Sequence, residues 1–165
     1  MTQVLVAYAS KMGATREIAE AIGARFTERG LRTTVLDAGT VDSVAEHDAV
    51  VLGSAVYAAR WRPEAVRFAR RHRAALSDRR TWLFESGWIG PRPASVTATP
   101  GARRRASRLG APVPTVFGGR LDPALATGLL DRALAKRMPG DARDWDEIRT
   151  WADRVADALG VMHGN

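Results

Sequence analysis

Short continuous apolar runs alternate along the chain with segments in which apolar residues recur every three or four positions. Continuous apolar runs are typical of strands that are buried on both faces of a sheet. They predict five strands, over residues 4–8, 32–36, 49–53, 81–85 and 114–117. The intervening segments have helical spacing, and alternating strands and helices predict a parallel sheet built from βαβ units.

The first and last helices carry the clearest signals. The first begins near Thr15 and ends before Gly30, a residue that commonly stops a helix. The last follows a capping-box pattern formed by Asp144 and Glu147, and Gly160 closes it. Its expected buried stripe consists of Ile148, Trp151, Ala152, Val155 and Leu159.

Three further helices are predicted with less regular patterns. One covers 63–76, with Pro63 suited to its first turn, and a short one covers 101–109. Asp122 and Pro123 can cap and start another, which ends by 139–140. The order of elements predicts an α/β fold with a doubly wound, right-handed sheet, in one domain over 1–165.

One long segment, 86–113, is rich in Pro, Gly, Ser and Arg. A loop of this length in a compact domain is usually functional or disordered, so we expect a lid or a partner-binding insertion there. Ligands in doubly wound sheets bind outside the carboxyl ends of the strands, which is the side where this segment begins.

The composition excludes several kinds of binding site, and the sequence lacks the segments expected of membrane-spanning or secreted proteins. The chain has no cysteine, which excludes disulfides, thiolate zinc sites and cysteine-held clusters, and we expect no metal site. Its longest apolar run, 49–59, is far shorter than the ~20 residues of a membrane helix. The N-terminus leads directly into a strand pattern without a signal peptide, so a cytoplasmic location is expected.

The charge is strongly positive and unevenly distributed. The net charge is +7, and only Lys11 and Lys136 are lysines. Residues 60–108 hold thirteen arginines and three acidic residues, so this stretch carries +10 and the rest of the chain −3. One interpretation is a solvated arginine-rich face; the other is a docking face for an anionic partner.

The loop after the first strand, 10–15, has the chemistry of a phosphate site. Gly13 lets consecutive N–H groups converge, and the helix that follows presents unpaired N–H groups with a positive partial charge. Ser10 and Thr15 add hydroxyl donors, and Lys11 lies alongside. The alternative is purely structural, with Thr15 as a helix cap and Gly13 as a turn residue.

The pattern Ser10-x-x-Gly13-x-Thr15 resembles the phosphate loop of flavodoxins, and most of all that of the flavodoxin-like, menaquinone-dependent protoporphyrinogen dehydrogenases. Residues 15–19, Thr-Arg-Glu-Ile-Ala, are similar to that sub-family residue for residue. Further similar stretches are 50–56, 116–121 and Asp144-Trp145, so the resemblance covers most of the chain outside 87–112. It implies a flavodoxin-like sheet with strand order 2-1-3-4-5.

The resemblance also implies FMN as cofactor. The phosphate would lie on Ser10, Lys11, Met12, Gly13, Ala14 and Thr15. The ring would be flanked by Ala55, Val56, Tyr57, Ala58, Trp61, Ser86, Gly87 and Trp88, within loops expected at 54–61 and 86–88. The three aromatic residues are candidates for stacking, and the alternative for each is packing in the core.

Two departures from the family pattern bear on function. Met12 stands where flavodoxin phosphate loops usually carry a hydroxyl residue, and 121–125 lacks the aromatic residue of the protoporphyrinogen dehydrogenases. The loop 56–59 lacks the glycine that lets electron-carrying flavodoxins adopt positive φ beside the flavin, which favours two-electron chemistry.

The leading hypothesis is an FMN-dependent oxidoreductase acting on a small anionic substrate, with a quinone or another acceptor. Arg60, Arg62, Arg92 and 103–105 would suit such a substrate or an anionic membrane surface. The alternatives are a small electron-transfer flavodoxin with a redox protein partner, and a cofactor-less binding module. No aromatic interleaving or recognition motif points to specific nucleic-acid binding.

No catalytic acid–base pair stands out from the sequence. His47, His72 and His163 are scattered and read as surface residues. Glu85 ends the fourth strand and could reach the site, although pairing with a nearby arginine is the ordinary expectation.

Overall fold

The computed structural model describes residues 1–11, 13–88, 92–121 and 140–160. The main sheet has the order β2-β1-β3-β5-β6, and every neighbouring pair on this path is parallel. Its strands are β1 (Gln3–Ala9), β2 (Arg32–Asp37), β3 (Ala49–Tyr57), β5 (Arg80–Trp88) and β6 (Thr115–Gly118). These are the five predicted strands in the predicted order, so the fold class is confirmed.

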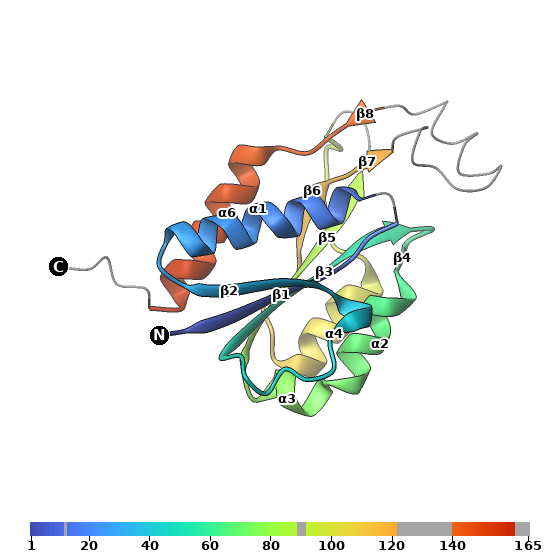
Figure 1. Ribbon diagram of the computed structural model, residues 1–165. Coiled ribbons are helices and arrows are strands. Elements are labelled where there is room, and N and C mark those ends of the chain that lie inside the picture. Colours follow the sequence, from blue (N-terminus) through green and yellow to red (C-terminus); the bar gives the residue numbers. More distant parts are fainter. Residues whose placement is uncertain (12, 89–91, 122–139, 161–165) are drawn as a thin grey trace.

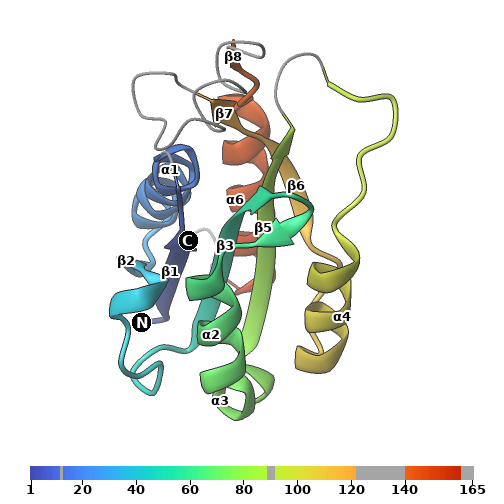
Figure 2. The ribbon, with the colours of Figure 1, turned by 90° about the vertical axis from the view of Figure 1, so that its right-hand side faces the viewer.

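Helices cover both faces of the sheet (Figures 1 and 2). One face carries α1 (Ala14–Glu28) and α6 (Trp145–Ala158). The other carries α2 (Pro63–Arg71), α3 (Arg73–Ser77) and α4 (Pro100–Leu109). Three short elements lie outside these layers: the 3-10 helix η1 (Ala38–Thr40), and the strands β7 (Arg120–Leu121) and β8 (Gly140–Asp141), which pair antiparallel with each other.

Each face has its own apolar core. On the α1–α6 side, Ile18 and Ile22 of α1 and Ile148 of α6 are completely buried against β1, β3 and β5. The expected stripe of α6 is confirmed, with Leu159 partly buried at its end. On the opposite side, the small residues Ala65, Ala102 and Ala106 let α2 and α4 approach the sheet closely.

The start of α6 and both ends of α4 carry residues that commonly begin or end a helix. Asp144 caps α6 by accepting from the backbone N–H groups of Asp146 and Glu147, at 3.1 Å each. Thr99 caps α4, Pro100 opens it, and Gly110 follows its last residue with φ +67°. The predicted helix at 101–109 is therefore confirmed, and it packs on the sheet as an ordinary layer of the fold.

Three boundaries differ from the prediction. The expected loop 54–61 is largely strand, because β3 continues to Tyr57 and turns back into β4 (Arg60–Trp61). The expected loop 86–88 belongs to β5, with a register irregularity between Ser86 and Trp88. The predicted helix 63–76 is divided into α2 and α3 at His72. The helix predicted from Asp122 to 139–140 lies outside the described residues.

The strand extension includes a buried polar residue, Ser54. Ser54 interrupts the apolar run that predicted the strand, yet its side chain is completely buried. The hydroxyl donates to the carbonyl of Ala55 at 2.9 Å and accepts from the N–H of Arg62 at 2.9 Å. A hydroxyl satisfied in this way costs little to bury, so the strand continues through it.

None of the helices in the described ranges is both long and apolar enough to cross a bilayer. The same ranges contain no cluster of three or more His, Asp or Glu side chains arranged to hold a metal ion.

Candidate functional site

The register of the sheet brings three chain segments to one edge. Ala9 at the end of β1 lies opposite Ser54 of β3, and Ala55 lies opposite Ser86 of β5. Trp88 in turn lies opposite Gly118 at the end of β6. The loop at 10–13, the end of β3 and the end of β5 therefore emerge side by side at the carboxyl edge, where doubly wound sheets bind ligands.

The loop after β1 has an open helix N-terminus. Gly13 precedes α1 with φ +83°, a left-handed conformation that glycine adopts without steric cost. The hydroxyl oxygen of Ser10 accepts from the N–H of Gly13 at 2.9 Å, which closes the turn. No described side chain caps the first N–H groups of α1, so these donors and the helix dipole remain available to an anion.

Thr15 adds a second observation at the same place. It is 1% exposed, and its Oγ1 has no hydrogen-bond partner among the described residues. A buried hydroxyl without a partner is costly, and a bound group that accepted its hydrogen bond would remove that cost. The orphaned hydroxyl, the uncapped helix and the turn at Gly13 fit a phosphate group at this loop.

Lys11 connects this loop to the end of β3. Its Nζ lies 3.8 Å from the centroid of the Tyr57 ring, within the range of a cation–π contact. The loop and the half-buried Tyr57 are therefore in direct contact. Met12, predicted to lie within the same loop, is outside the described residues.

The turn between β3 and β4 has an uncommon backbone. Val56 pairs with Trp61 and Tyr57 with Arg60, which leaves a two-residue turn at Ala58 and Ala59. The twist of such a hairpin requires positive φ at both turn residues, and φ is 52° and 60°. The expectation that this loop avoids positive φ because it lacks glycine is wrong, since hairpin geometry overrides the preference of alanine.

Trp61 and Glu85 form a buried hydrogen-bonded unit beneath this turn. Trp61 is 5% exposed and belongs to the core on the α2–α4 side, so it presents little of its ring at the edge. Its Nε1 donates to Oε2 of Glu85 at 2.7 Å. Thr99 donates to the same carboxyl group from its N–H at 2.8 Å and from its hydroxyl at 2.6 Å.

Within the described residues Glu85 has no hydrogen bond or ion pair with an arginine, although its charge raises the pKa of the nearby Arg105. Its hydrogen bonds within the described residues come from Trp61 and Thr99, which tie β5 to the β4 hairpin and to the cap of α4. The sequence places these three residues far apart, and only the fold brings them together.

The end of β5 holds the remaining predicted ring residues. Ser86 is buried, Gly87 is exposed and Trp88 is half-buried. The carbonyl of Trp88 accepts from the N–H of Gly119 at 2.6 Å, and the guanidinium of Arg92 lies 5.3 Å from the Trp88 ring centroid. Arg92 also pairs with Glu147 of α6 at 3.0 Å, which fixes this end of the connection to α4.

Sequence reasoning missed Arg143. Its side chain is only 4% exposed, and it pairs with Asp141 at 2.6 Å and with Glu17 in the first turn of α1. The hydrogen bond to Asp141 raises the pKa of Arg143 above its ordinary value, and the bond to Glu17 also raises it. Nothing in the local pattern distinguishes Arg143 from its exposed neighbours, because its partners come from two separate segments.

Comparison with known proteins gives one family. A family model described as "Flavodoxin domain" matches residues 5–132. No curated protein matches the chain.

Solved structures share the fold at low identity. A flavodoxin from the domain Archaea is 17% identical, with a TM-score of 0.65 over 96% of this chain and 99% of that one. Oxidised Flavodoxin 2 from Bacillus cereus is 18% identical, with the same score and coverage. The rubredoxin oxygen:oxidoreductase from Desulfovibrio gigas is 14% identical, with a TM-score of 0.66 over 99% of this chain and 38% of that one.

Proposed function

The chain belongs to the flavodoxin domain family, and from that premise we propose that it binds FMN at the carboxyl edge of its sheet. The phosphate is bound by the loop 10–15, and the ring lies against the ends of β3 and β5. The proposed ring contacts are Ala55, Val56, Tyr57, Ala58, Ser86, Gly87 and Trp88, with Trp61 supporting the hairpin from below. When bound, FMN supplies the redox chemistry, and the protein supplies position and electrostatics.

The observation that carries the proposal is the buried hydroxyl of Thr15, which has no partner among the residues that the structure describes. It lies in the first turn of α1, where the uncapped N–H groups also face outward. A phosphate dianion would satisfy both, because its oxygens accept several hydrogen bonds at once.

We expect Thr15→Val to weaken FMN binding by at least tenfold, because a hydrogen bond to a charged group is worth about 1.5–3 kcal/mol. Binding is measured by titrating FMN fluorescence. Riboflavin, which lacks the phosphate, should bind equally well to both proteins. The unfolding free energy of the cofactor-free variant should be equal or higher, since the substitution removes an orphaned polar group.

A matched control is Thr27→Val, in the same helix, whose hydroxyl donates to the carbonyl of Gly23 at 3.0 Å. It should leave FMN affinity unchanged. Equal loss of FMN and riboflavin in Thr15→Val would contradict a phosphate contact. A protein that takes up no FMN at all would instead favour the cofactor-less binding module.

We further propose that the protein catalyses two-electron oxidation of an anionic substrate, with a quinone or another acceptor, as the resemblance to protoporphyrinogen dehydrogenases implies. The exposed Arg60 in the hairpin and Arg92 beside Trp88 support an anionic substrate at this edge. The alternative is an electron-transfer flavodoxin with a protein partner.

A reductive titration distinguishes these two activities. If two-electron chemistry operates, the FMN-loaded protein should be reduced in one two-electron step, with no separate one-electron stage. Two well-separated one-electron steps would favour the electron carrier. Ala58→Gly lets the peptide group of the turn change its orientation freely. Compared with the wild type, this variant should be reduced more nearly in two separate one-electron steps.

A further inference from the structure

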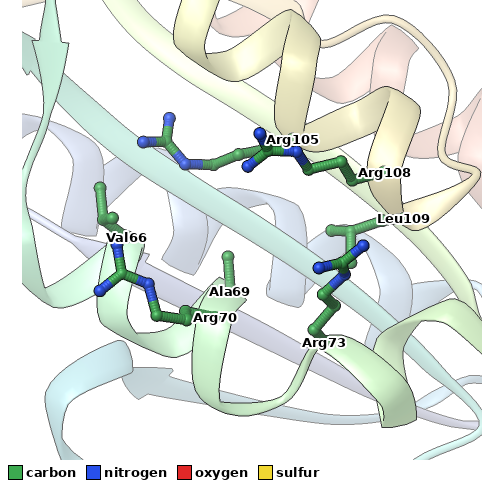
Figure 3. Close-up of a pocket in the computed structure, with 7 residues that line it drawn as sticks. All are labelled: Val66, Ala69, Arg70, Arg73, Arg105, Arg108 and Leu109. Carbon is green, nitrogen blue, oxygen red and sulfur yellow. The ribbon is translucent and has the colours of Figure 1, made fainter.

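A cavity of about 350 Å³ lies between α2–α3 and α4, on the outer side of the helical layer (Figure 3). Its floor is apolar and consists of Val66, Ala69 and Leu109. Its walls are four arginines, Arg70 and Arg73 from one side and Arg105 and Arg108 from the other. No residue of the proposed FMN site lines it.

The arginines form two rows. Arg70 and Arg73 are three positions apart across the α2–α3 joint, and Arg105 and Arg108 are three positions apart on α4. This spacing places both members of a pair on the same side of their helical segment. The two rows therefore border the apolar floor from opposite sides, and we call this feature the arginine groove.

The groove gathers positive charge with little compensation. No carboxylate lines it, and none of its four guanidinium groups has a hydrogen bond or ion pair with the described part of the chain. Glu85, beneath the hairpin, is a negative charge that acts on Arg105 from outside the lining. Arginines elsewhere in the same ranges do have such partners, as the pairs of Arg25 and Arg29 with Asp153 show. The groove therefore concentrates unneutralised positive charge at one place.

This arrangement disfavours the charged form of Arg105. Its guanidinium lies 5.3 Å from the Trp61 ring centroid, so it is partly enclosed by the hairpin. Burial lowers the pKa of Arg105, and the positive charges of Arg104 and Arg108 lower it further. Arg70, across the groove, acts in the same direction, whereas Glu85 raises this pKa. An anion placed between the rows would relieve this repulsion.

We infer that the arginine groove docks an acidic amphipathic segment of a partner protein, with an apolar side chain on the floor and carboxylates against both rows. Arginine forms bidentate pairs with carboxylates and is favoured at protein interfaces. The inference goes beyond the proposed cofactor site, and it holds whether or not FMN is bound.

The shape of the groove decides between classes of anion. A single small anion would leave the apolar floor uncovered or one row unpaired. A flat bilayer surface would meet the rims and miss a floor recessed between two helices. The lining contains no aromatic ring on which the bases of a single-stranded nucleic acid could stack. A polypeptide segment alone supplies apolar and acidic groups with matching periodicity.

The test is fluorescence anisotropy of a labelled helical peptide with one leucine face flanked by glutamates, using the full-length protein without FMN. We expect saturable binding that Arg70→Gln/Arg108→Gln weakens by about tenfold. Arg67→Gln/Arg104→Gln is the matched control, because it removes two exposed arginines of the same helices that do not line the groove. It should weaken binding by less than about twofold.

Two further arms test the floor and the identity of the anion. A peptide with serine in place of leucine should bind more weakly to the wild type, and Val66→Ser should reduce the difference between the peptides. Absence of binding, or equal losses in the two double variants, would overturn the inference. Displacement by citrate or phosphate at the peptide's own concentration, or groove-dependent binding to phosphatidylserine vesicles, would also overturn it.

Discussion

Gly53 of β3 lies opposite Phe84 of β5 in the sheet. A Cβ atom at this position would lie 1.9 Å from Cζ of Phe84, the residue opposite it in the sheet. Phe84 is completely buried, and its ring is held by Phe117 at 5.7 Å and Trp151 at 6.1 Å between centroids. The glycine is therefore required by space, not by backbone conformation.

We predict that Gly53→Ala lowers the free energy of unfolding by about 3 kcal/mol, because the ring can move aside only by disturbing the core. Gly101→Ala in α4 is the control, since its Cβ would meet only the mobile end of Arg105, at 3.1 Å. It should raise stability by roughly 0.5–1 kcal/mol through helix propensity. Urea unfolding measures both, and an unchanged midpoint for Gly53→Ala would refute the prediction.

At the scale of elements, the joint between α2 and α3 is built around a histidine. His72 is 8% exposed, and its ring centroid lies 4.7 Å from that of Phe68. Burial lowers the pKa of His72, the charge of Arg71 lowers it further, and a hydrogen bond with the backbone of Val41 opposes both. The sequence-based expectation of a surface residue is wrong here.

The lowered pKa makes stability depend on pH. The folded protein binds a proton less readily at His72 than the unfolded chain does, whose histidine pKa is about 6.5. The contribution is therefore fully present above pH ~6.5 and is lost as the pH falls toward the folded value. We predict that His72→Gln loses less stability than the wild type between pH 7.5 and pH 5.5 in urea unfolding.

Phe68→Leu is the matched comparison, because it alters the same packing without changing a titrating group. Because this variant retains the imidazole of His72, it should still lose stability between pH 7.5 and pH 5.5, unlike a variant without a titrating group at position 72. If His72→Gln keeps the full pH dependence of the wild type, the dependence originates elsewhere in the protein.

Elements with continuous patterns and local caps were predictable from the sequence. β1, α1 and α6 are examples, since apolar spacing and the residues Gly13 and Asp144 specify them locally. The extension of β3 and the partners of Glu85 could not be predicted from the sequence, because they depend on contacts with residues that are not adjacent in the chain. For the candidate site, the sequence indicated the turn at Gly13 between β1 and α1, whereas the hairpin at Ala58 and Ala59 required the register of the sheet.

At the scale of the whole molecule, the two helical layers differ in whether their arginines have carboxylate partners. On the α1–α6 side, Asp153 accepts from Arg25 and Arg29, and these bonds hold the pKa of Asp153 below its ordinary value. On the opposite side, the arginine groove has no such partners in the described ranges. Four of the arginines in 60–108 are therefore gathered on this layer, and under the proposed docking their charge would orient an acidic partner before contact.

The proposed cofactor edge and the arginine groove meet at a single unit. Trp61 lies below the hairpin at the edge and also contacts Arg105 of the groove. The two sites are thus separate in their lining but share a structural support. A partner seated on α4 would therefore lie near the proposed cofactor edge.

The buried carboxyl group of Glu85 has a consequence for how this sequence can diverge. Replacing Trp61 alone removes one of the two side-chain donors to the buried Oε2 of Glu85, and replacing Thr99 alone removes the other. Either single change costs more than replacing the donors and the acceptor together with apolar groups of similar shape. Positions 61, 85 and 99 are therefore not free to drift one at a time. Among descendants of this chain, we expect them to be retained as a set or exchanged as a set.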